Sequence, residues 1–139
     1  MNTVLSRLGI NGEFTGINDI VSNGKKISGN AQTRKQGVVL QHGTILLDVD
    51  VERMFSLLKV SDEKTRGKMI DKVKERVTSL KQELGKEADI EDVKSALLKG
   101  FEEEFDIGFE QEELTDHERN LAERLYREKY STEEWNGSR

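Results

Sequence analysis

The sequence lacks cysteine and proline altogether, and only 6% of its 139 residues are aromatic. Without cysteine, these residues can form no disulfide and no thiolate zinc site, and they offer no cysteine nucleophile. They contain no apolar run near the roughly 20 residues that a membrane-spanning helix needs. They also show no N-terminal basic segment leading into a hydrophobic stretch. We therefore expect a cytoplasmic protein with no membrane partner.

Hydrophobic residues are scarce as well, at 34% of the chain against 35% charged residues. Ordinary domains carry about 25% charged residues, so we expect a thin core beneath solvated helices, with room for a partner. The net charge is −5, but residues 1–45 hold five Lys or Arg side chains and only two Asp or Glu. This basic segment has a single aromatic, Phe14, so it lacks the stacking platforms of a nucleic-acid binder. A small anion such as a phosphate is the ligand we expect, with no nucleic acid.

Hydrophobic periodicity predicts strands in residues 1–50 and mainly helices in residues 51–139, which is the order of an α+β fold. The helix over 90–105 should begin at Asp89 as its N-cap and bury its whole apolar face. Shorter helices are expected over 51–58 and about 63–84.

Asn23-Gly24 is the strongest short hairpin signal in the chain, and it separates predicted strands at 18–22 and 25–29. Residues 38–49 (VVLQHGTILLDV) are apolar on both alternating faces, a pattern typical of a strand covered on both sides. The sequence therefore predicts a sheet whose second half needs a cover.

Two capping boxes are predicted in the last third of the chain, Thr115 with Glu118 and Ser131 with Glu134. The first should open a helix with an apolar stripe. That stripe, which we expect to be buried, consists of Leu121, Leu125 and Tyr126.

Lys25 and Lys26 begin a strand directly after the Asn-Gly turn, and Gly29 follows on the same strand. A lysine held on a rigid strand beside a glycine can place its ammonium against phosphate and carbonyl oxygens. A solvated lysine pair that discourages strand pairing is the commoner explanation. Spacing alone leaves both interpretations open.

His42, Gly43 and Thr44 interrupt an otherwise apolar strand. The glycine suggests close approach of a ligand to the backbone, although a hydrogen-bonded core histidine beside a bulge is the commoner structure. Asp19 stands apart from other carboxylates in the sequence. It could bind magnesium together with a nucleotide's phosphates, or it could be an ordinary turn aspartate.

The joint pattern of motifs resembles the central segment of the lipoate-protein ligases, within the superfamily of biotinyl and lipoyl ligases and octanoyltransferases. Order and spacing both agree, and the archaeal-style ligases are the most similar. The motifs that carry the resemblance are GIND at 16–19, KISGNA at 26–31, HGTILL at 42–47, KERVTSL at 74–80 and EKYSTEEWN at 128–136.

The resemblance implies a ligase that converts lipoate and ATP to lipoyl-adenylate. It then transfers the lipoyl group to a lysine of a lipoyl domain, in a 2-oxoacid dehydrogenase or a glycine-cleavage protein. Lys26 stands at the position of the family's lysine that contacts the acyl carbonyl and phosphate oxygens, and Asp19 becomes the candidate Mg²⁺ ligand. The implied lining of the ATP and lipoyl-adenylate pocket is Asn18, Lys26, Gly29, Asn30, His42, Gly43 and Thr44.

Two features depart from the family pattern. Ile17 replaces a common arginine, and the family's upstream Arg-rich and triple-glycine motifs have no counterpart here. We therefore expect residues 1–139 to be one incomplete catalytic domain, either a subunit that joins a second polypeptide carrying the N-terminal half or a fragment of a longer ligase. The alternative in a different class is a non-catalytic remnant that binds lipoyl domains or a regulatory partner.

Overall fold

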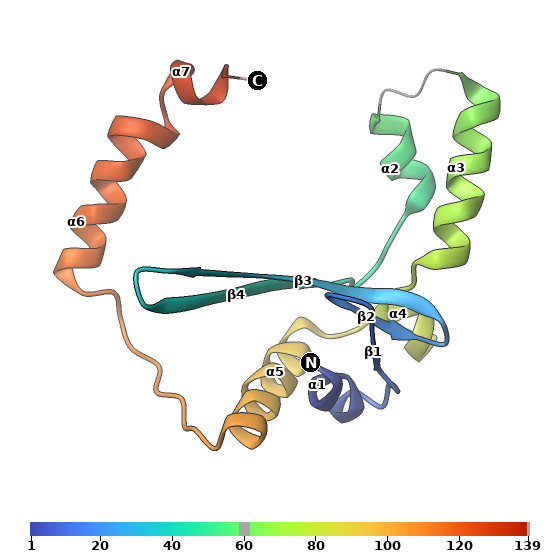
Figure 1. Ribbon diagram of the computed structural model, residues 1–139, viewed down its shortest axis with the longest axis horizontal. Helices are drawn as coiled ribbons and strands as arrows, with labels where there is room; N and C mark the ends of the chain where they lie inside the picture. The colour runs from blue at the N-terminus through green and yellow to red at the C-terminus, as the bar shows by residue number, and fades with distance from the viewer. Residues whose placement is uncertain (59–61, 139) are drawn as a thin grey trace. The chain divides into compact units, whose positions relative to one another are not determined.

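The structure, a computed structural model, describes residues 1–58 and 62–138 (Figure 1). The chain forms two compact units, Met1–Ile107 and Gly108–Arg139. The single catalytic domain over residues 1–139 stays a prediction. No helix in the described ranges is long and apolar enough to cross a membrane.

The first unit is built on a four-stranded antiparallel sheet in chain order, as expected for an α+β fold. Asn23 and Gly24 adopt positive φ angles of 48° and 75°, so the predicted hairpin is confirmed. A second tight turn, at Gln36 and Gly37, joins the two longest strands. The strands are β1 (Glu13–Thr15), β2 (Asp19–Ser22), β3 (Lys25–Lys35) and β4 (Val38–Ile45).

Helices pack against the sheet in a core on one of its sides (Figure 1). The helices α1 (Asn2–Arg7), α4 (Leu80–Leu84) and α5 (Ile90–Phe105) supply the packing. Their apolar side chains meet strand residues in a small core. That core consists of Leu5, Ile10, Ile20, Ile27, Leu80 and Val93.

The helix predicted over 63–84 is interrupted in the structure. Helix α3 spans Glu63–Arg76, residues 77–79 are not helical, and α4 follows. The interruption arises because Thr78 N donates a hydrogen bond of 2.9 Å to Lys26 O, which draws this segment alongside β3. Ahead of α3, the helix α2 (Val51–Leu57) begins at Asp50, whose carboxylate accepts from Arg53 N.

One burial expectation for the first unit is wrong. Helix α5 begins after Asp89 as predicted, but the apolar residues Ile90, Leu98 and Phe105 are exposed, because the sheet and α1 reach only the stripe of Val93, Ala96 and Gly100. The apolar residues at the start of β4 are exposed as well, and no described residue of the first unit covers them, so the cover that the sequence requires stays a prediction. These residues are Val38, Val39 and Leu40.

The second unit contains α6 (Asp116–Leu125), the π-helical turn η1 (Tyr126–Tyr130) and α7 (Glu133–Asn136). The predicted Thr115–Glu118 capping box is confirmed. The Ser131 box is wrong, because Thr132 caps α7 instead and accepts from Trp135 N at 3.2 Å.

The stripe expected to be buried on α6 is largely open. Leu125 and Tyr126 are exposed, and Leu121 is half-buried. The other helical segments of this unit, η1 and α7, are short and leave these apolar side chains accessible.

Candidate functional site

A β-bulge shapes the start of strand β3. Ile20 pairs with Ser28, but the next residue of β2, Val21, pairs with Lys26. Two residues of β2 therefore face three of β3, and Ile27 is the additional one. Bulges of this kind redirect the side chains around them.

The bulge turns Lys26 to the face of the sheet that carries Asp19. In a regular strand, residues three apart point to opposite faces, so Lys26 and Gly29 would be separated. With Ile27 as the extra residue, Lys26 pairs with Val21 and Gly29 pairs with Asp19, two β2 residues on one face. Ile27 itself is fully buried in the core on the other side.

Asp19, Lys26 and Gly29 meet in what we call the Lys26 cluster. Lys26 Nζ lies 2.6 Å from Asp19 Oδ1, and the two side chains are 41% and 35% exposed. Oδ1 is shielded from solvent, and this close contact is an ion pair that lacks hydrogen-bond geometry. A Cβ on Gly29 would lie 3.0 Å from both Cε and Nζ of Lys26. The cluster thus presents a partly exposed cation above a residue without a side chain, where an anionic ligand can approach.

The two neighbouring lysines have different partners. Lys25 Nζ donates to Lys74 O at 3.0 Å, at the end of α3, whereas Lys26 Nζ pairs with Asp19. The backbone of Lys26 is held from both sides, by Val21 in β2 and by the parallel bridge to Val77. Of the two, Lys26 has the more fixed environment.

Glu83 anchors the turn that precedes Lys26. Its Oε2 accepts from Ser22 Oγ at 2.8 Å and from Asn23 Nδ2 at 2.7 Å, and its Oε1 accepts from Thr78 Oγ1 at 2.7 Å. Burial acts to raise the pKa of the Glu83 carboxyl, but the three hydrogen bonds and nearby Lys25 outweigh it and lower the pKa. The carboxylate therefore stays ionised as the centre of this network.

The sequence contained no signal for this role of Glu83. About 60 positions separate it from the turn that it contacts, and Glu83 reads as an ordinary helical carboxylate.

Asn18 and Asn30 hold each other across the start of the sheet. Asn18 Nδ2 donates to Asn30 O at 2.6 Å, and Asn30 N donates to Asn18 O at 2.9 Å. A Cβ on Gly43 would clash with Asn30 Oδ1 and lie 2.9 Å from Gly29 O, so only glycine fits there. Asn30 and Gly43 pair with each other, one position along from the Gly29–Thr44 pair, so they face the opposite side of the sheet from Gly29.

His42 and Thr44 lie in a regular part of the sheet, paired with Ala31 and Gly29. Thr44 therefore shares the face of the Lys26 cluster, and His42 lies two residues further along the same face. His42 is exposed and β4 has no bulge there, so the expectation of a core histidine beside a bulge is wrong. The seven predicted pocket residues are thus divided between the two faces of one sheet.

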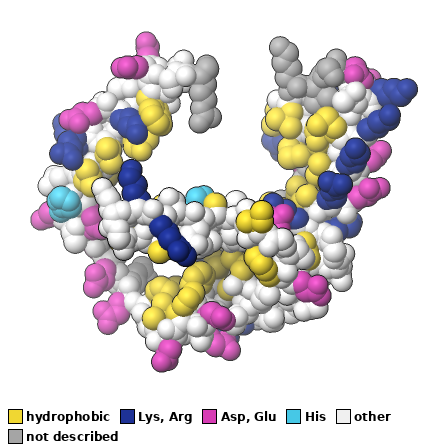
Figure 2. Space-filling model, viewed as in Figure 1, with side chains coloured by type: hydrophobic (Ala, Val, Ile, Leu, Met, Phe, Trp, Pro, Cys, Tyr) yellow, Lys and Arg dark blue, Asp and Glu magenta, His cyan; other side chains and the backbone are white. Residues whose placement is uncertain are grey.

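A groove of about 750 Å³ lies on the helical side of the sheet, and none of Asp19, Lys26 and Gly29 lines it. Figure 2 shows hydrophobic side chains gathered in this region below the sheet. Asn18 and Asn30 line the groove together with exposed apolar residues such as Phe14, Ile17 and Phe105. The groove can therefore accept an apolar body with polar groups at one end.

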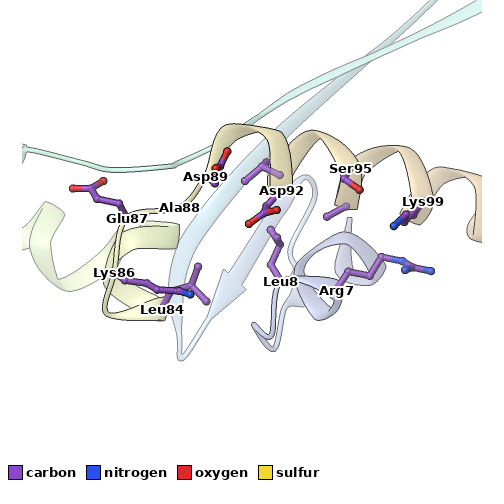
Figure 3. A pocket seen from close by; sticks show the side chains of 12 residues that line it. Arg7, Leu8, Leu84, Lys86, Glu87, Ala88, Asp89, Asp92, Ser95 and Lys99 are labelled. Carbon is purple, nitrogen blue, oxygen red and sulfur yellow. The ribbon is translucent and has the colours of Figure 1, made fainter. Parts of the chain in front are cut away.

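A separate depression of about 510 Å³ lies between α1, α4 and α5 (Figure 3). None of the residues that line it is a predicted site residue. Arg7, which is one of them, forms an ion pair with Glu103, with 2.6 Å between the guanidinium nitrogen and Oε2. We therefore place the candidate site at the Lys26 cluster. The charged residues of the depression are Arg7, Lys86, Glu87, Asp89, Asp92 and Lys99.

The described residues contain no group of three or more His, Cys, Asp or Glu side chains that could hold a metal ion by themselves. Asp19 is the single carboxylate of the cluster, and Lys26 already occupies the space beside its Oδ1. These residues alone do not make a metal site; one carboxylate is enough only where Mg²⁺ takes most of its oxygens from phosphates and water, as it commonly does with nucleotides.

Comparisons with known proteins agree with the motifs. The family described as lipoyl protein ligase A/B catalytic domain matches residues 1–102. An octanoyltransferase LipM of Clostridioides difficile (strain 630) is 38% identical over 121 residues, which are 87% of this chain and 44% of the relative. The chain thus spans less than half the length of that relative.

Two solved structures share the fold. A bipartite lipoate protein ligase from Thermoplasma acidophilum, described with its E2 lipoyl domain, has a TM-score of 0.82 and 34% identity, over 97% of this chain and 54% of that one. A lipoate-protein ligase A bound with ATP has a TM-score of 0.77 and 30% identity, over 97% of this chain and 54% of that one.

Proposed function

The chain belongs to the lipoyl protein ligase A/B catalytic-domain family, and from this premise we propose that it is part of an ATP-dependent lipoate-protein ligase. The observation that carries the proposal is the Lys26 cluster, in which a bulge directs a lysine ammonium over Gly29. In the first step, a lipoate carboxylate oxygen attacks the α-phosphorus of ATP and pyrophosphate leaves. In the second, the amine of an acceptor lysine attacks the acyl carbonyl, AMP leaves and an amide forms.

Lys26 would stabilise negative charge in both steps. A fixed cation aimed at oxygens that gain charge in the transition state lowers the barrier without reorganisation. Asp19 holds the ammonium at 2.6 Å and would also contact the magnesium that accompanies ATP as a substrate. Asn18, Asn30, His42, Gly43 and Thr44 would line the binding site for ATP and lipoyl-adenylate.

We propose further that a second polypeptide segment completes the site. The apolar start of β4 is exposed at a free sheet edge, which in a finished protein is normally paired or covered. This chain covers only 54% of the similar chain of a bipartite ligase, so the segment that completes the site would correspond to the rest of that chain, carried by a second polypeptide or by a longer form of this one. By the same likeness, the acceptor would be a lipoyl domain.

A transferase is the second candidate, because a LipM octanoyltransferase is among the similar proteins. A transferase with an acyl-cysteine intermediate would need a cysteine from outside these 139 residues, which contain none. The two candidates differ in one requirement. The ligase needs ATP and releases pyrophosphate, whereas the transferase moves an octanoyl group from an activated donor without ATP.

The test compares Lys26→Ala with Lys25→Ala in the complete enzyme, purified as the assembly that contains this chain. Removing one charge-stabilising donor typically costs about 100-fold to 1,000-fold in rate, so Lys26→Ala should lose lipoylation by about that factor. Lys25→Ala should remain within a few fold, because Lys25 bonds to Lys74 O instead of Asp19. Affinity for the lipoyl domain should survive in both variants.

Three outcomes would change the proposal. Equal activity of both variants would remove Lys26 from the mechanism. Octanoyl transfer without ATP, and no pyrophosphate release with ATP and lipoate, would favour the transferase. Lipoyl-domain binding with neither activity would favour the non-catalytic remnant.

A further inference from the structure

Glu83 contacts both segments that fix the backbone of Lys26. Ser22 ends β2 and Asn23 begins the turn, four and three residues before Lys26, and both donate to Glu83 Oε2. Thr78, which donates its hydroxyl to Glu83 Oε1, also donates its backbone N–H to Lys26 O at 2.9 Å. One carboxylate thus joins the turn before Lys26 to the segment alongside it.

The network lies on the opposite side of the sheet from the Lys26 ammonium. Ser22 is two residues after Ile20 on β2, so it shares the core face, and it is almost fully buried, as is Thr78. Asp19 and the Lys26 side chain occupy the other face. Glu83 therefore has no direct contact with the proposed reaction site and can act on it only through the backbone.

We propose that Glu83 is a positioning residue, which holds the turn and the bulge in the one geometry that directs the Lys26 ammonium to Asp19 and Gly29. The proposal rests on the proposed role of Lys26. The physical reason is that a bulge leaves its extra residue unpaired and disrupts the strand pairing locally, so contacts of the flanking residues must hold the strand in place. Here the side chain of Ile27 is held in the core, whereas the turn before Lys26 is tied to α4 by the hydrogen bonds to Glu83.

The experiment uses the complete enzyme with Glu83→Ala, Glu83→Gln and the control Glu87→Ala. Glu87 is an exposed neighbour that pairs with Lys81. We expect Glu83→Ala to lower kcat about tenfold, with the KM values for ATP and lipoate within about twofold. A displaced ammonium should stabilise the transition state less, while it changes substrate binding in the ground state little. Glu83→Gln should keep most of kcat, since its amide oxygen can accept from the turn and its NH₂ can donate to the Thr78 hydroxyl.

A double variant separates positioning from a general loss of stability. If Glu83 acts through Lys26, then Glu83→Ala should cause no further loss in a Lys26→Ala background. A further tenfold loss there, or equal effects of Glu83→Ala and Glu87→Ala, would overturn the inference.

Amide hydrogen exchange over residues 22–26 distinguishes failure of the inference from failure of the proposed function. Glu83→Ala should accelerate exchange in this segment at least tenfold, while Glu87→Ala should leave it unchanged. If Lys26→Ala proved fully active, the proposed function would fail, and faster exchange would still support Glu83 as the anchor of the turn. Unchanged exchange in Glu83→Ala would refute the inference whatever the activity.

Discussion

Replacing Gly29 with alanine tests the geometry of the Lys26 cluster directly. The new Cβ would lie 3.0 Å from Cε and Nζ of Lys26, whereas nonbonded carbon atoms prefer about 3.5–4.0 Å, so the end of Lys26 must retreat by about 0.5 Å. Misplacing a reacting group by about 1 Å can cost about 100-fold in rate, so a shift of half that size should cost about tenfold. Gly29 has no positive φ that alanine would strain.

The assay is the initial rate of lipoylation of a lipoyl domain by the complete enzyme at saturating ATP and lipoate. Gly67→Ala is the matched control, because the same substitution in α3 meets no atom within 4 Å. Its rate should be unchanged. A Gly29→Ala enzyme as active as the control would show that the position of the Lys26 ammonium over Gly29 does not limit the reaction.

Three further expectations concern stability, each measured by urea unfolding. Gly100→Ala should destabilise the first unit by about 1–3 kcal/mol, since its Cβ would lie 2.7 Å from Val4 Cγ2, and unchanged stability would contradict this packing. Gly67→Ala should stabilise by about 0.4–1 kcal/mol, and a loss would show that α3 needs its glycine. Because the folded state lowers the pKa of Glu83 from 4.5, its contribution is complete above about pH 4.5 and is lost as the pH falls through the folded value. The wild-type protein should therefore lose stability more steeply below pH 4.5 than Glu83→Gln, and parallel curves would contradict the shift.

Local signals in the sequence predicted local structure well. The Asn23-Gly24 turn, the N-cap at Asp89 and the capping box that begins at Thr115 depend on residues a few positions apart, and all three are confirmed. Each is a short-range hydrogen-bond or φ preference, which needs no knowledge of the fold.

Features that depend on distant residues were missed. The break in the helix after Arg76 occurs because Thr78 bonds to Lys26, and periodicity within 63–84 carries no trace of that contact. Leu125 is exposed although burial was expected. An apolar stripe indicates that a helix can pack against another surface, but it does not show that such a surface is present. Motif resemblance selected Asp19, Lys26 and Gly29, which the structure brings together, but it gave no indication of the bulge that does so.

The bulge at Ile27 has a consequence for how the Lys-Ile-Ser-Gly motif should be searched for and altered. An odd interval between two residues that must share a face can be accommodated in a strand only by one extra residue. Deleting Ile27 would restore regular pairing and leave Lys26 two positions before Gly29. The Lys26 side chain would then stay on the face of Gly29, while the core would lose the Ile27 side chain. A protein with Lys and Gly two positions apart could therefore share this geometry without a bulge, and a search pattern with a fixed interval would overlook it.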